Sequence, residues 1–206
     1  HIPYGEPSDG TEKETVCGLG NKKNQRFVEI IKREGAEVYP STIECIKALQ
    51  KEGIRAGVAS SSKNCQLILQ STGIEGLFET RVDGVVSAKL GLKGKPEGDI
   101  FIRAAQDLEL LPYECVVVED ATSGVQAGRN GGFGLVLGIA REGNSCDLFM
   151  NGADMVVKDM GEITLADIEA WFERIPPYFF DVWQKREALK DARINPWYGK
   201  PAKELL

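Results

Sequence analysis

The chain has 206 residues, of which 42% are hydrophobic and 27% charged, and this composition excludes intrinsic disorder of the whole chain. Its 25 basic and 31 acidic side chains give a net charge of −6. We therefore expect no nucleic acid partner, because sequence-independent binding depends on neutralising phosphates. No apolar run reaches the length of a membrane span, so we expect no membrane partner either.

The cysteines and the single histidine exclude several further chemistries. The five cysteines include no CxxC pair, and their number is odd. We predict that they are small apolar fillers in a reducing, cytoplasmic compartment rather than disulfides or zinc ligands. The only histidine is His1, which excludes histidine-based triads and metal clusters. Oxygen ligands, lysines and hydroxyls must then carry any chemistry.

The apolar pattern predicts short strands that alternate with amphipathic helices. Residues 1–23 are polar and rich in Gly and Pro, and we predict a loop there. We place a helix N-cap at Ser41, with Glu44 completing a capping box. Helices are predicted at 23–34, 42–52, 65–73, 95–108, 121–131 and 165–172. Strands are predicted at 55–59, 83–88, 115–118, 135–139 and 155–157.

This alternation predicts an α/β fold with a parallel sheet covered by helices on both faces. In such folds ligands bind at the carboxyl ends of the strands. Two of the predicted strands stop abruptly in polar residues, one at Ser60 and the other at Glu119 and Asp120. We therefore expect the functional site at these two strand ends.

The adjacent carboxylates of Glu119 and Asp120 repel each other unless a cation lies beside them. Oxygen ligands without histidine or thiolate suit Mg²⁺, which takes one or two carboxylates and keeps several waters. The alternative is that one acid caps the next helix while the other is solvated.

Hydroxyls and a lysine indicate an anion site. Ser60, Ser61 and Ser62 stand between a buried strand and a helix, where hydroxyl and backbone N–H groups suit phosphate. The alternative is a plain serine N-cap. Lys95 precedes Pro96, which is favoured in the first turn of a helix, and a lysine fixed there can neutralise a phosphate or a carboxylate. A solvated surface lysine is the alternative.

The order of these segments resembles motifs two, three and four of the haloacid dehalogenase superfamily. The segments read Ala-Ser-Ser-Ser-Lys-Asn at 59–64, Gly-Lys-Pro-Glu-Gly-Asp-Ile-Phe at 94–101, and Val-Glu-Asp-Ala-Thr-Ser-Gly-Val-Gln-Ala-Gly at 118–128. Within the superfamily they are most similar to the β-phosphoglucomutase branch, which shares the Ser-Lys-Asn run and the Glu-Asp-x-x-x-Gly-x-Gln-Ala pattern. The resemblance covers about residues 20–160.

The resemblance implies a Rossmann-like three-layer α/β/α core with a parallel sheet, together with the remnant of a helical cap. It implies Mg²⁺-dependent phosphoryl transfer on a small sugar phosphate, by a mutase or a phosphatase, through an aspartyl-phosphate. The implied residue roles are phosphoryl binding by Ser60, charge balance by Lys95, Mg²⁺ binding by Glu119 and Asp120, and lining of the phosphate and substrate pocket by Ser61, Lys63 and Asn64. Lys23, on the cap helix, is implied to help hold the sugar phosphate.

The sequence departs from the family in one respect, because the first motif, Asp-x-Asp-Gly, does not occur in it. Asp9 precedes Gly10, but Pro7 stands in the nucleophile's position and no apolar strand leads into it. We expect the isolated chain to be inactive, either because an N-terminal segment is absent or because the protein is a natural relict. The alternative function is a non-catalytic remnant, a phosphate-binding or interaction module of a larger fused sugar-phosphate protein.

The expected domains follow from the same resemblance. Residues 1–37 are the remnant of the cap with its linker, and 38–174 are the core without its first strand. Residues 175–206 are a linker or tail helix, which in some fused proteins precedes a trehalose-phosphatase-like module. In the family the first-motif strand lies between the strands that end at Ser60 and Glu119. We expect these two strands not to close up and pair directly.

Overall fold

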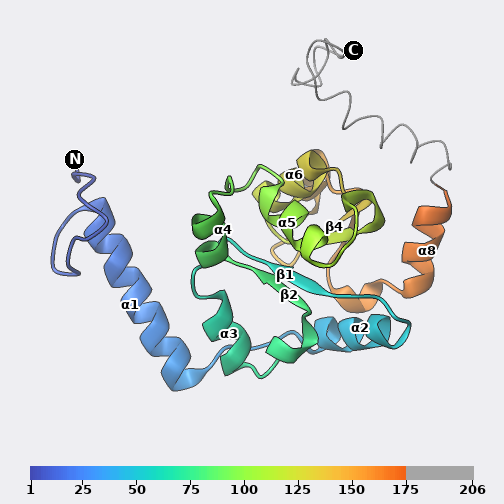
Figure 1. The fold of residues 1–206 in the computed structure, drawn as a ribbon, viewed down its shortest axis with the longest axis horizontal. Coiled ribbons are helices and arrows are strands. Elements are labelled where there is room, and N and C mark those ends of the chain that lie inside the picture. Colours follow the sequence, from blue (N-terminus) through green and yellow to red (C-terminus); the bar gives the residue numbers. More distant parts are fainter. Residues whose placement is uncertain (175–206) are drawn as a thin grey trace, which may run out of the picture.

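The computed structural model describes residues 1–174, so the predicted helix within 175–206 lies outside the described part of the chain. The described helices are α1 (Val16–Glu34), α2 (Pro40–Lys51), α3 (Cys65–Ser71), α4 (Gly84–Leu90), α5 (Asp99–Asp107), α6 (Thr122–Gly131), α7 (Ser145–Met150) and α8 (Leu165–Glu173) (Figure 1). Short 3₁₀ turns lie at Glu75–Leu77, Pro112–Glu114 and Met160–Glu162.

The strands form two parallel sheets. In the first, β1 (Gly57–Ala59) pairs with β2 (Thr80–Val82). In the second, the order is β3 (Val116–Glu119), β4 (Leu135–Ile139) and β5 (Met155–Val157). Every ladder is parallel, and helices connect the strands, so the prediction of a parallel α/β fold is confirmed.

Helices pack on both faces of the sheet whose central strand is β4. All five of its residues are buried. Val136 packs into a cluster with buried residues of α5 and α6, while Leu135, Leu137 and Ile139 pack into a second cluster with side chains of α2 and α8. Because successive side chains of a strand point to opposite faces, the sheet is the middle of three layers.

Helix α1 begins at Val16, so the prediction of a loop up to residue 23 is wrong. Thr15 caps this helix through a hydrogen bond from the Gly18 amide to its hydroxyl (2.9 Å). The buried Asp9 carboxylate accepts hydrogen bonds from Lys13 and from Thr15, both at 2.7 Å, and these bonds hold the pKa of Asp9 at about 2. The first fifteen residues are thereby fixed to the start of α1. The helix lies at one end of the molecule, apart from both sheets (Figure 1).

Two further predictions are wrong for local reasons. The stretch predicted as a strand at 83–88 forms α4, because Asp83 accepts hydrogen bonds from the Val85 and Val86 amides and so starts a helix. Helix α2 is preceded by Tyr39 and has Pro40 in its first turn, so Ser41 lies inside the helix and is not its cap.

No ladder joins the two sheets within the described residues. Within residues 1–174, β1 pairs only with β2, and β3 pairs only with β4. Val118 of β3 is 44% exposed although it follows two valines in the strand. One edge of β1 and one edge of β3 therefore carry backbone groups without a ladder partner from the described residues.

These edges predict a weakly stable chain. An exposed strand edge tends to pair with another chain, and a typical domain has a total free energy of unfolding of only about 5–15 kcal/mol. We expect urea unfolding, followed by far-UV circular dichroism, to give about 5 kcal/mol or less, or to show association of the chain.

A lysine introduced at the edge of β3 tests whether association occurs through this edge. Val118→Lys is expected to reduce association, because a lysine on an edge strand disfavours strand pairing between copies. A monomer that unfolds in one cooperative transition, with stability well above the bottom of that range, would contradict the expectation.

Candidate active site

The loop from Ser60 to Asn64 follows the carboxyl end of β1. The Ser60 amide donates to the Val82 carbonyl (2.9 Å), which continues the pairing of β1 with β2. The Ser60 and Ser62 hydroxyls then accept hydrogen bonds from the Ser62 and Asn64 amides, at 3.2 and 3.1 Å. Ser61 and Lys63 are exposed. The loop is thus ordered by its own serines and presents alternate side chains outward.

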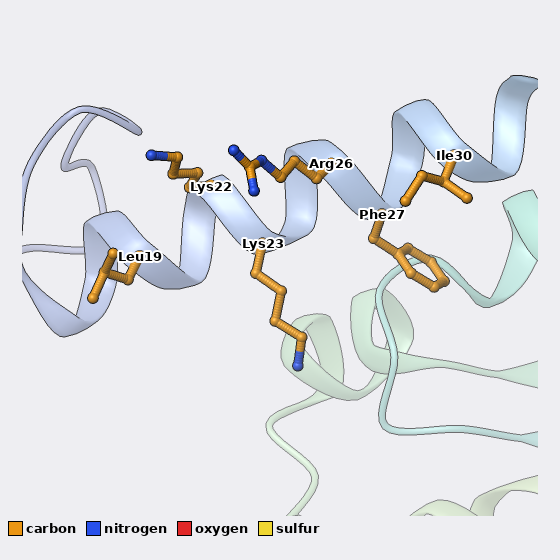
Figure 2. Close-up of a pocket in the computed structure, with 6 residues that line it drawn as sticks. All are labelled: Leu19, Lys22, Lys23, Arg26, Phe27 and Ile30. Carbon is orange, nitrogen blue, oxygen red and sulfur yellow. The ribbon is translucent and has the colours of Figure 1, made fainter.

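Helix α1 contacts this loop through two amide side chains. The side-chain amide nitrogen of Asn64 (Nδ2) donates to the side-chain oxygen of Asn24 (Oδ1) at 2.7 Å. Lys23 is the neighbour of Asn24 in α1 and lines a shallow hollow of about 410 Å³ (Figure 2). Figure 2 shows Lys23 pointing away from Lys22 and Arg26. The predicted cap residue therefore lies on the helix that is hydrogen-bonded to the predicted phosphate loop.

Lys95 and Glu119 form an ion pair at the end of β3. Their side chains are only 16% and 10% exposed. The Lys95 ammonium also lies 4.9 Å from the centre of the Phe101 ring. Burial lowers the pKa of Lys95, and the Asp120 carboxylate partly offsets this effect. The structure thus brings Lys95 together with Glu119 and Asp120, three residues that the sequence analysis names as site candidates.

Room for the Glu119 carboxyl group comes from a glycine. A side chain at Gly124, in the first turn of α6, would overlap this carboxyl group. The Ala121 amide also donates to Glu119 Oε2, at 3.4 Å. Asp120, the next residue, is exposed, and its backbone carbonyl accepts a hydrogen bond from Asn144 at 3.2 Å. One carboxylate is therefore held by protein groups and the other faces outward.

The setting of Lys95 differs from the prediction. The sequence places Lys95 and Pro96 at the start of a helix, but α5 begins at Asp99, and Gly98 is its N-cap. The Glu97 amide donates to the Gly94 carbonyl at 3.0 Å, so this segment is a turn before the helix. No hydrogen bond among the described residues joins Lys95 to the Ser60–Asn64 loop.

The donor set suits magnesium in its chemistry, although it is small. Glu119 and Asp120 offer hard oxygen atoms, which Mg²⁺ prefers. Residues 1–174 contain no group of three or more His, Cys, Asp or Glu side chains arranged to hold a metal. A magnesium ion bound there must complete its coordination with water or with a ligand's oxygens, as Mg²⁺ usually does.

Sequence reasoning missed three residues next to the site, namely Asn24, Asp83 and Asn144. Asn144 follows β4, and Asp83 directly follows β2. Both are polar residues close behind the end of a strand, the same signal that identified Ser60 and Glu119. Asn24 has no such signal, because only the folded chain brings α1 to α3.

The fold and these strand-end loops define a Rossmann-like α/β domain with its candidate site at the carboxyl ends of parallel strands. The model of haloacid dehalogenase-like hydrolases matches residues 5–132. The chain therefore belongs to the haloacid dehalogenase-like hydrolase family, within its β-phosphoglucomutase-like branch.

Three relatives illustrate the similarity. A β-phosphoglucomutase of Mycobacterium bovis is 41% identical over 165 residues, which are 79% of this chain and 63% of that enzyme. A trehalose-phosphate phosphatase of Mycobacterium leprae is 35% identical over 140 residues, 66% of this chain and 31% of the phosphatase. A crystal structure of β-phosphoglucomutase from Clostridium difficile shares the fold, with a TM-score of 0.65, 24% identity, and coverage of 79% of this chain and 68% of the other.

No helix within residues 1–174 combines the length and the apolar character needed to cross a membrane. The chain spans about 63% of the length of the mycobacterial β-phosphoglucomutase that it matches.

The ion pair at Lys95 gives a prediction for stability. Lys95→Met leaves the largely buried Glu119 carboxylate without its cation, and we expect the free energy of unfolding to fall by about 3 kcal/mol. The double variant Lys95→Met/Glu119→Gln is expected to regain most of this loss, since it removes the uncompensated charge. Urea unfolding of the variants measures both effects.

The exposed Lys93 provides a matched control, because Lys93→Met removes the same charge without exposing a buried partner. We expect Lys93→Met to change the free energy of unfolding by no more than about 0.5 kcal/mol. Equal effects of the two single variants would show that the ion pair contributes nothing to stability.

Proposed function

We propose that this chain carries the greater part of a Mg²⁺-dependent phosphoryl-transfer site for a small sugar phosphate, of the β-phosphoglucomutase or sugar-phosphate phosphatase type. The observation that carries the proposal is the cluster of Lys95, Glu119 and Asp120 at the end of β3. The ordered serine loop at the end of β1 supports it, as do relatives named β-phosphoglucomutase and trehalose-phosphate phosphatase.

The proposed phosphate ligands are hydroxyl, amide and ammonium groups of the Ser60–Asn64 loop. The Ser60 oxygen accepts a hydrogen bond from the Ser62 amide, and the hydroxyl also lies within hydrogen-bond reach of the Cys65 thiol; on binding, its proton would turn to the phosphate. The exposed Ser61 and Lys63 lie on the same loop, and Asn64 anchors it to α1. Lys23, on α1, would contact the distal part of the sugar phosphate.

Lys95 would neutralise negative charge that develops during transfer. Burial lowers the pKa of Lys95 and the Asp120 carboxylate partly offsets this effect, while Glu119 holds the ammonium in an ion pair. Glu119 and Asp120 would hold Mg²⁺. That ion, when bound, supplies positive charge to the phosphoryl oxygens. The glycine at position 124 leaves room for the Glu119 carboxylate where it now lies.

The proposal predicts that the isolated chain is inactive. In the family the first Asp of Asp-x-Asp-Gly attacks the phosphorus, and the 206 residues contain no such motif. We expect hydrolysis of p-nitrophenyl phosphate or of sugar phosphates, with Mg²⁺ present, to equal the rate without protein.

If any activity is measured, Asp120→Ala shows whether it depends on the Asp120 carboxylate. Glu97→Ala is the control, because it removes an exposed acidic side chain that has no role in the proposal. A Mg²⁺-dependent rate that Asp120→Ala abolishes and Glu97→Ala preserves would show that another group of this chain replaces the nucleophile.

The phosphate site is tested by titration with inorganic phosphate, followed by backbone amide chemical shifts. We expect the largest shift changes at 60–64 and near Lys95, because these groups donate to the anion. Ser60→Ala should weaken binding by about tenfold, the value of one hydrogen bond to an anion. Ser71→Ala, an exposed serine at the end of α3, should leave it unchanged. Shift changes confined to other regions would rule out this site.

The second candidate is a non-catalytic phosphate-binding or interaction module of a larger fused protein. The observation that favours it is the match to the M. leprae phosphatase, of which this chain covers only 31%. The coding sequence upstream of His1 distinguishes the candidates. An in-frame Asp-x-Asp-Gly after an apolar strand would favour the enzyme, and its absence would favour the module.

We also propose a division of the chain into a cap part and a core, and a cytoplasmic location of the protein. Residues 1–37, which contain α1, would be part of a cap, and 38–174 would be the core. A cytoplasmic location agrees with the five cysteines, which form no disulfide within the described residues.

A further inference from the structure

Asp83 is a fully buried carboxylate outside the cluster at the end of β3. Its exposed fraction is 0%, and it directly follows β2. One of its oxygens accepts hydrogen bonds from the Val85 and Val86 amides, both at 3.0 Å, and the other is ion-paired with Arg81. Surface carboxylates cap helices without being buried, so capping alone does not explain the burial of this one.

The residue after Asp83 lies directly against the candidate phosphate loop. The Gly84 amide donates to the Ser62 carbonyl at 3.1 Å. A Cβ atom at Gly84 would lie 2.6 Å from the Ser61 carbonyl oxygen and 2.9 Å from the Lys63 amide nitrogen. Its backbone is not in the left-handed region, so the close approach of the loop, and not the backbone conformation, requires a glycine here.

We propose that Asp83 and Gly84 are positioning residues that set the conformation of the Ser60–Asn64 loop. Asp83 fixes the first turn of α4, and this turn presents Gly84 to the loop as a hydrogen-bond donor without a side chain. The loop's hydroxyls and amides are then oriented by contacts from β2 and α4, which contribute no ligand themselves. The consequence for anion binding rests on the proposed function, whereas the effect on the loop does not.

Pairing of β1 with β2 makes this arrangement stiff. The Ala59–Val82 register and the hydrogen bond from the Ser60 amide to the Val82 carbonyl fix the loop and Asp83 at equivalent ends of neighbouring strands. A shift of the first turn of α4 therefore moves Gly84 relative to Ser61 and Lys63, because the strands below do not follow.

Gly84→Ala and Gly76→Ala test the contact in the free protein. Both changes add one methyl group, but the methyl group at Gly76 meets no atom within 4 Å. We expect Gly84→Ala to shift the backbone amide signals of 60–64 and to speed hydrogen exchange at Ser62 and Asn64, whose amides bond within the loop. Gly76→Ala should change neither. Equal loop signals in the two variants would overturn the proposal.

A second pair of variants covers the case in which Gly84→Ala does not fold. Asp83→Ala removes the cap of α4, and Thr164→Ala removes the hydroxyl cap of α8, which lies elsewhere in the chain. Both should lower the midpoint of urea unfolding. Only Asp83→Ala should alter the loop signals, and Asp83→Asn, which keeps an acceptor oxygen, should restore them. Loop signals that Asp83→Ala leaves unchanged would overturn the proposal.

Inorganic phosphate is the probe for the functional consequence. If the unchanged chain binds phosphate at 60–64, Gly84→Ala or Asp83→Ala should weaken the affinity by about tenfold or more, as expected for a lost hydrogen bond to an anion. Gly76→Ala and Thr164→Ala should bind as the unchanged chain does. Failure of the unchanged chain to bind phosphate overturns the proposed function, and the loop signals in the free variants still decide the role of Asp83 and Gly84.

Discussion

Lys95 and Glu119 form an ion pair whose side chains are 16% and 10% exposed, and this pair constrains the rest of the candidate site. Removal of two charges from water is costly unless the charges stay in contact. The turn that carries Lys95 must therefore remain against the end of β3. A side chain at Gly124 would displace the Glu119 carboxyl group from this position. Asp120 is left exposed beside them, where its carboxylate would hold Mg²⁺ together with Glu119.

The sheets explain why polar groups gather in these loops. Strands such as β4 are buried on both faces and exclude polar side chains, so the chain places them directly after its strands. Ser60, Asp83 and Glu119–Asp120 occupy this position behind β1, β2 and β3. They differ in role, because Ser60 and Asp120 face a ligand in our proposal, while Asp83 is buried and acts on the neighbouring loop.

The sequence predicted the parallel α/β architecture, because apolar periodicity is a local signal. It assigned Lys95 to the phosphate site at the start of a helix, whereas the structure pairs Lys95 with Glu119 in a turn before that helix. Two predictions failed where side-chain contacts decide, and one tertiary contact was missed. Glycines at 18 and 20 hid the start of α1, which the Thr15 cap and the buried Asp9 stabilise. Valines at 85 and 86 suggested a strand, but the Asp83 cap starts a helix there. The link from Asn24 to Asn64 joins residues forty positions apart, which no local pattern reveals.

The central claim is that the loop behind β1 and the carboxylates behind β3 act as one site, and thermodynamic coupling tests it most directly. Isothermal titration calorimetry of the chain with inorganic phosphate, with and without Mg²⁺, measures this coupling. The account predicts that Mg²⁺ tightens phosphate binding by about fivefold or more, and that Asp120→Asn abolishes this effect while phosphate still binds. An affinity for phosphate that Mg²⁺ leaves unchanged would contradict it.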